Sequence, residues 1–132
     1  MRTHLEFRSA ELLDDHDNPD LPQGKKVAEL LLSMLPSAGF KVQDLIAEDW
    51  GWCVKLHHDT FPLWIGCGFY PDYEDGLLCF IEPSQPFVRR WLKRIPTVET
   101  VERLATAVES ILREMKSVHA LRWWTEAEVR HR

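Results

Sequence analysis

The chain has 132 residues and a formal charge of −5, and 45% of its residues are hydrophobic, 28% charged and 11% aromatic. This is the composition of one soluble globular domain over residues 1–132, and it excludes long disordered regions. The longest uncharged stretch, at residues 60–71, falls well short of the roughly 20 residues that a membrane helix needs. No secretory signal is expected, because charged side chains interrupt residues 1–10.

Charge and cysteine content bear on the compartment and the partners. Residues 1–83 carry a net charge of −9 and residues 84–132 a net charge of +4. Because the chain as a whole is acidic, we do not expect non-specific binding to nucleic acid. The spacing of Cys53, Cys67 and Cys79 matches no disulfide or zinc framework. We therefore expect three reduced thiols, no metal, no cofactor and a cytoplasmic location.

The first third of the chain reads as a strand, a loop and a helix. Residues 3–8 alternate between apolar and polar, which predicts a short strand. Residues 9–24 are acidic and rich in turn formers, which indicates a loop. Residues 25–35 place apolar side chains at helical spacing, and Pro36 and Gly39 are expected to end that helix.

The centre of the chain reads as a meander of strands. From residue 40 the apolar period changes to two, and short turn-forming segments separate the apolar runs. Local hairpins of this kind predict antiparallel pairing. The strands are expected at residues 40–48, 52–58, 61–70 and 77–82.

The last third reads as mainly helical. Residues 86–94 predict a short helix that turns Phe87, Val88, Trp91 and Leu92 inward. A longer amphipathic helix is expected to start at Thr97, and residues 118–124 are expected to form a last strand. The order β-α-β-β-β-β-α-α-β predicts an α+β fold. We expect a two-layer sandwich, with a mostly antiparallel sheet of four to six strands and helices on one face.

The densest group of candidate binding residues lies at two predicted turns. Glu48, Asp49, Trp50 and Trp52 place two carboxylates beside two indoles, which suits an anchor surface for a partner. The same residues also fit an acidic turn whose indoles pack on the sheet. A second acidic aromatic turn carries Tyr70, Asp72 and Tyr73.

Three further features leave alternatives open. A hydrolase or transferase would use Glu48 or Asp49 as a base with His57 or His58, although no nucleophile or phosphate-loop motif is present. The cations of residues 89–94 suit a solvated helix face, an acidic protein partner or nucleic acid. The pair Trp123 and Trp124 suits the edge of a homodimer.

The helix from Gly24 to Leu35, then Gly39 and the segment Glu48-Asp49-Trp50-Gly51-Trp52, resembles small bacterial α+β proteins that share an E-D-W-G-W hairpin. The likeness spans residues 20–125, and it implies no activity, cofactor or catalytic residue. In size and layout the chain is also similar to immunity and inhibitor proteins encoded beside bacterial toxins. We therefore expect a non-enzymatic protein-binding module, with a small hydrolase or transferase and a homo-oligomer as the alternatives.

Overall fold

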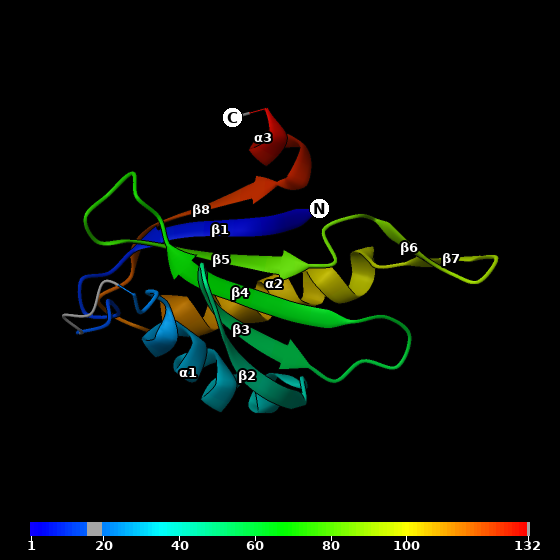
Figure 1. Cartoon of the computed structure of the whole chain (residues 1–132), viewed down its shortest axis with the longest axis horizontal. Coiled ribbons are helices and arrows are strands. Elements are labelled where there is room, and N and C mark those ends of the chain that lie inside the picture. Colours follow the sequence, from blue (N-terminus) through cyan, green and yellow to red (C-terminus); the bar gives the residue numbers. More distant parts are fainter. Residues whose placement is uncertain (16–19, 132) are drawn as a thin grey trace.

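The computed structural model describes residues 1–15 and 20–131, so part of the loop expected at residues 9–24 lies outside the described residues. Its centre is a six-stranded antiparallel sheet with the order β2-β3-β4-β5-β1-β8 (Figure 1). The α+β class, the antiparallel sheet and the helical layer are confirmed. The strands of this sheet are β1 (Arg2–Arg8), β2 (Val42–Glu48), β3 (Gly51–Leu56), β4 (Leu63–Phe69), β5 (Gly76–Glu82) and β8 (His119–Thr125). The helices are α1 (Lys25–Met34), the 3-10 turn η1 (Leu35–Ala38), α2 (Val98–Arg113) and α3 (Glu126–Arg130).

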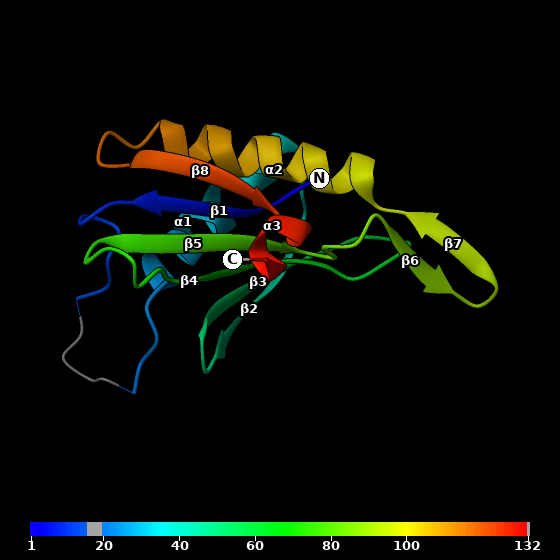
Figure 2. The ribbon, with the colours of Figure 1, turned by 90° about the horizontal axis from the view of Figure 1, so that it is seen from above.

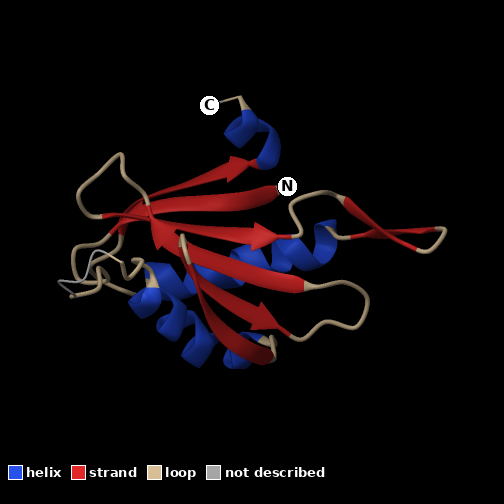
Figure 3. Cartoon of the chain, in the orientation of Figure 1, coloured by secondary structure: helices blue, strands red, loops and turns tan. Residues whose placement is uncertain are grey.

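The sheet has one covered face and one open face. Alternate residues of the inner strands point to the same side, where they meet the apolar stripes of α1 and α2. Figures 2 and 3 show α2 along one side of the sheet, with the β2–β3 hairpin bent away from it. The largest fully buried side chains are Leu5, Phe7, Val27, Leu31, Leu35, Val54, Ile65, Leu77, Ile81, Val101, Leu104 and Leu112.

The first turn of helix α1 is capped by a carboxylate from the loop that precedes it. Asp14 accepts hydrogen bonds from the backbone N–H groups of Gly24, Lys25 and Lys26, each at 2.9 Å. These donors would otherwise lack a partner at the helix N-terminus, so the loop carboxylate acts as a remote cap. The helix stops at Met34, and Gly39 follows at a φ of 91°, as the sequence predicts.

The segment 86–94 is not the helix that its spacing predicts. Residues Phe87–Arg90 form strand β6, residues Lys93–Pro96 form strand β7, and the two pair as a separate hairpin. Trp91 and Leu92 are the two residues of its turn and are 94% and 99% exposed, so the expectation that they face inward is wrong. Helices α1 and α2 cover the packed face of the sheet, and of the arm residues only Val88 and Ile95 pack against the core.

Two smaller findings complete the fold. All three cysteines are buried and free, and Cys67 and Cys79 face each other with their sulfurs 3.9 Å apart. Within residues 1–15 and 20–131, no helix combines the length and the apolar character needed to cross a membrane.

Candidate functional site

The β6–β7 hairpin, residues 87–96, which we call the arm, carries the two most exposed large hydrophobic side chains among the described residues. It projects beyond one end of the sheet, in line with the strands (Figures 1 and 2). Its tip consists of Trp91, which has a φ of 60°, and Leu92. Large apolar side chains are rarely left in water at a turn, and a positive φ is uncommon for a bulky residue. The tip is therefore an apolar surface that the fold itself does not use.

The cations of the arm fall into two groups. Arg90 reaches back to the body, where it donates to the carbonyl oxygens of Asp59 and Thr60 at 3.4 and 3.3 Å. Arg94 lies over the ring of Phe87 at 4.1 Å. In the part of the chain that the structure describes, Arg89 and Lys93 make no hydrogen bond, ion pair or ring contact. The side chains of Arg89 and Lys93 therefore place two positive charges, without an intramolecular partner among the described residues, next to the apolar tip.

The base of the arm is held to the body by Thr97. This buried residue donates its backbone N–H to the carbonyl of Pro86 at 3.0 Å, and its hydroxyl donates to the carbonyl of Gln85. Thr97 stands at the N-cap of α2 as predicted, but its side chain joins the two ends of the arm instead of capping the helix. The arm is therefore a projection that is anchored to the body at its base.

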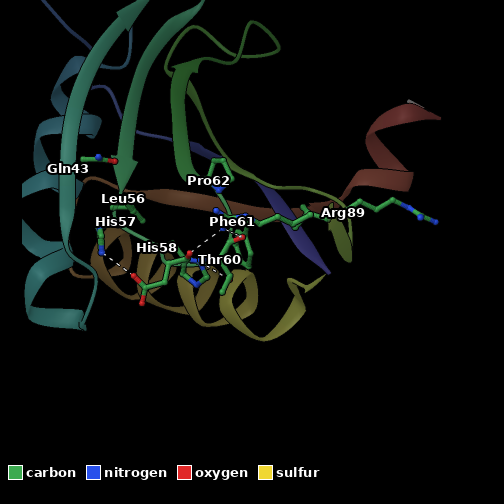
Figure 4. A pocket seen from close by; sticks show the side chains of 11 residues that line it. Gln43, Leu56, His57, His58, Thr60, Phe61, Pro62 and Arg89 are labelled. Atoms are coloured by element: carbon green, nitrogen blue, oxygen red, sulfur yellow. Dashed lines mark hydrogen bonds and ion pairs between the residues drawn. The ribbon is translucent and has the colours of Figure 1, made fainter. Parts of the chain in front are cut away.

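A cavity of about 660 Å³ lies beside the base of the arm and contains both predicted histidines (Figure 4). His57 Nε2 lies 3.3 Å from Asp59 Oδ1, and the ring of His58 packs on Phe61 with the ring centroids 4.1 Å apart. Figure 4 shows the side chain of Arg89 extending away from the histidines. His58 Nδ1 lies 3.4 Å from the Thr60 hydroxyl oxygen, and no contact given for the described residues joins the two histidines to each other.

The proposed acid–base pairing is not assembled by this fold. Glu48 and Asp49 lie at the start of β3, whereas His57 and His58 lie just past its end. Six strand residues separate the two groups, which corresponds to about 20 Å at roughly 3.3 Å per residue. Side chains this far apart cannot act on one substrate bond, so the geometry does not favour the hydrolase or transferase alternative.

A second apolar surface lies on the open face of the sheet, and we call it the aromatic groove. Three rings pack around one centre: the centroid of Phe80 lies 5.1 Å from that of Trp50 and 5.6 Å from that of Trp64. Phe80 covers Gly66, where a side-chain carbon would overlap the ring. The groove has a volume of about 320 Å³. It is lined by Trp50, Trp64, Gly68, Phe69, Leu78 and Phe80.

Of the first predicted turn, residues 48–52, only Trp50 lines this groove. Trp50 lies in the groove and is 44% exposed, and Glu48 and Asp49 are exposed beside it. Trp52 turns to the covered side of the sheet, where Lys25 Nζ lies 5.3 Å above its ring. Trp50 lies in the turn before β3, so it does not follow the alternation of the strand, and the two indoles lie on opposite faces and do not form one anchor surface.

The second predicted turn lies at the same end of the sheet, because Gly51 pairs with Gly68. Tyr70 is only 6% exposed, whereas Tyr73 is exposed and Asp72 lies on the same exposed turn. The guanidinium of Arg8 lies 4.5 Å from the Tyr73 ring centroid, and its Nε lies 2.7 Å from Asp75 Oδ1. Hydrogen bonding to Arg8 lowers the pKa of Asp75 below its ordinary value.

The tryptophan pair on the edge strand β8 is engaged within the chain. Trp123 Nε1 donates to Glu109 Oε1 at 2.7 Å, and this hydrogen bond lowers the pKa of Glu109. Trp124 Nε1 donates to Glu6 Oε1 at 2.6 Å. Both indoles are half-buried, so they are not two free rings at the edge of the sheet. What the edge strand β8 offers a second chain is its backbone.

Neither a metal-binding cluster nor a likeness to a known protein identifies a site in the described residues. Among the residues that the structure describes, no three histidine, cysteine or carboxylate side chains gather so as to hold a metal ion. Comparisons with protein-family models, with curated proteins and with solved structures found no match. The candidate site is therefore defined by its geometry: the arm at one end of the sheet, and the aromatic groove with its acidic turns toward the other.

Sequence reasoning missed the arm and most of the groove. The signal for the arm was present in Pro86 and Pro96, which bracket the basic segment and disfavour a continuous helix. The signal for the groove was the glycine pair Gly66 and Gly68, since bare strand positions invite a ring from the neighbouring strand.

Proposed function

We propose that this chain is a non-enzymatic protein-binding module of the bacterial cytoplasm, immunity-like, inhibitor-like or regulatory in role. Its principal anchor is the tip of the arm. The observation that carries the proposal is the near-complete exposure of Trp91 and Leu92 on a hairpin fixed at its base. Tryptophan and arginine are the residue types most enriched among the energetically dominant contacts of protein interfaces.

The energetics favour a partner that encloses the tip. Burying a leucine or similar side chain contributes about 1.5–3 kcal/mol, and an indole is larger still. A paired hairpin anchored at its base loses less conformational freedom on binding than an unpaired loop, so more of this energy is retained as affinity. Arg89 and Lys93 add charge complementarity and favour a partner surface with carboxylates around an apolar cleft.

The acidic aromatic turns provide a second contact surface in this proposal. Trp50 is its anchor, since its indole is half-exposed in the aromatic groove, and Asp49 and Glu48 are its charge contacts. Tyr73 and Asp72 extend the same end of the molecule. Trp52 and Tyr70 support these turns from inside and do not touch the partner.

The proposal is tested by comparing variants in an affinity capture from a lysate of the source cells. The arm variant combines Trp91→Gly with Leu92→Ser, because a Gly-Ser turn preserves a two-residue hairpin. The control is Leu21→Ser, which also removes an exposed leucine but lies in the loop before α1. Wild type and control should retain one stoichiometric protein that the arm variant loses. Equal retention by a folded arm variant would refute the arm as the anchor.

A further inference from the structure

The arm and the acidic end of this molecule carry opposite charge. The arm holds four cations and no carboxylate, so with a total of −5 the rest of the chain carries −9. The turns at the groove end expose Glu48, Asp49 and Glu74. A cationic projection and an acidic end on one chain attract each other between copies over about a Debye length.

The apolar parts of the two surfaces also match. The groove, at about 320 Å³, has room for one indole, and its walls are aromatic rings that stack with an indole or receive a guanidinium. Its rim is accessible, since Trp50 and Phe69 are both 44% exposed. Trp91 is the one tryptophan of the described chain that lies almost wholly in solvent.

The placement of the two surfaces excludes docking within one chain. The arm follows the carboxyl end of β5, whereas Trp50, Gly68 and Phe69 lie toward the opposite end of the sheet. The arm also points away from the body (Figure 1). A second copy related by a two-fold axis across the open face would bring each arm to the other's groove. Two identical contacts then form, and the assembly closes as a dimer.

We infer that two copies of this chain exchange arms, with Trp91 of each copy seated in the aromatic groove of the other and Arg89 and Lys93 facing the carboxylates of Glu48 and Asp49. The inference rests on the proposed function, because it uses the same arm and names a second copy as its partner. The contact is small for a permanent interface, so the dimer forms reversibly in the micromolar range, and it weakens as salt rises.

The test is analytical ultracentrifugation of the purified chain over about 1–200 µM, a range that brackets micromolar association. Wild type should pass from 15.5 kDa to twice that mass, and Leu21→Ser should do the same. The arm variant Trp91→Gly/Leu92→Ser and the groove variants Trp50→Ala and Asp49→Lys should each weaken association at least tenfold. Asp49→Lys replaces an exposed side chain, so it remains informative if Trp50→Ala unfolds.

A mixing experiment identifies the two surfaces as each other's partners. The arm variant retains its groove, and the Trp50→Ala variant retains its arm, so a mixture regains one of the two contacts. We expect a 1:1 complex of the two variants that neither forms alone. A mixture that associates no more tightly than either variant alone, while wild type dimerises, would show that the surfaces do not meet.

The outcomes also separate this inference from the proposed function. A wild-type chain that is monomeric throughout the range overturns the arm exchange, as does a dimer that no arm or groove variant weakens. If the chain is monomeric but its arm captures a different protein from the lysate, the proposed function stands and only the second copy is refuted. If the arm variant changes neither experiment, both proposals fail.

Discussion

Replacing Gly66 with alanine tests whether the aromatic groove is built on a bare strand position. The ring of Phe80 lies directly over Gly66 on the neighbouring strand, and an alanine methyl group would overlap three of its ring carbons. The backbone of β4 is held on both sides by strand pairing, so the ring must move and not the strand. We therefore expect Gly66→Ala to destabilise the protein, although alanine usually suits a strand better than glycine.

The magnitude follows from the rings that Phe80 contacts. Its centroid lies 5.1 Å from Trp50, 5.6 Å from Trp64 and 5.8 Å from His4. Aromatic pairs of this kind contribute about 0.5–1.5 kcal/mol each beyond their buried area. The gain from a less flexible unfolded chain is only about 0.5–1 kcal/mol. A displaced ring that keeps part of its contacts then gives a net loss of about 1–2 kcal/mol.

The assay is urea unfolding followed by tryptophan fluorescence, with the midpoint compared at constant slope. A double-mutant cycle with Phe80→Leu isolates the overlap, because a smaller side chain leaves room for the methyl group. In that background Gly66→Ala should cost less than about 0.5 kcal/mol. A native-background variant that is as stable as wild type, or an equal cost in both backgrounds, would refute this account of the groove.

Three further results are expected. Asp14→Ala should lower the free energy of unfolding by about 1–2 kcal/mol in urea melts, because three N–H groups of α1 lose their acceptor. Burial lowers the pKa of His4, and nearby Glu126 only partly offsets it. The unfolded chain therefore binds the proton more readily, and stability should fall as pH drops from about 7.5 through the ordinary histidine range. His4→Gln should flatten that dependence in urea midpoints measured against pH. The hydrogen bond with Cys79 and, after it, burial raise the pKa of Cys67, so a thiol reagent should label Cys67 only after unfolding. Rapid labelling of the native protein would contradict its burial.

The elements with strong periodicity were predictable because burial enforces the period. Strand β4 alternates Leu63, Ile65 and Cys67 toward the helices, and each is buried as expected. Helix α2 keeps the 3.6-residue period, and its apolar stripe is buried on the sheet. Where one face of an element must meet the core, the sequence pattern and the structure agree.

The order of the strands could not be predicted in the same way. Strand β1 lies between β5 and β8, far from its neighbour in sequence. Its side chains alternate as any strand's would, and nothing in that pattern names its partners. The side-chain contacts on the open face could not be predicted either, because they depend on the strand order. His4 meets Phe80 only because β1 pairs with β5.

The candidate site was only partly predictable from local rules. Strand alternation puts residues two apart on the same face, so it predicts that Trp50 and Trp52 point the same way. They lie on opposite faces because Trp50 belongs to the turn and only Trp52 to strand β3. The burial of Tyr70 could not be predicted from the sequence, because it depends on how the turn folds back onto the rest of the chain. Its backbone N–H donates to Gly76 at 3.0 Å, and its ring lies 6.2 Å from that of Tyr73.

The arm departs from the turn chemistry that local sequence rules favour. Trp91 stands at a positive φ, and Arg89 faces Arg94 and Arg90 faces Lys93 across the strands, where like charges repel. An apolar turn between cations thus lowers both the stability and the solubility of the chain alone. Turns selected for folding carry glycine, asparagine or aspartate at such positions. Trp91 and Leu92 are almost wholly exposed and do not belong to the core, so the proposed partner contact would supply the compensation that the fold itself does not.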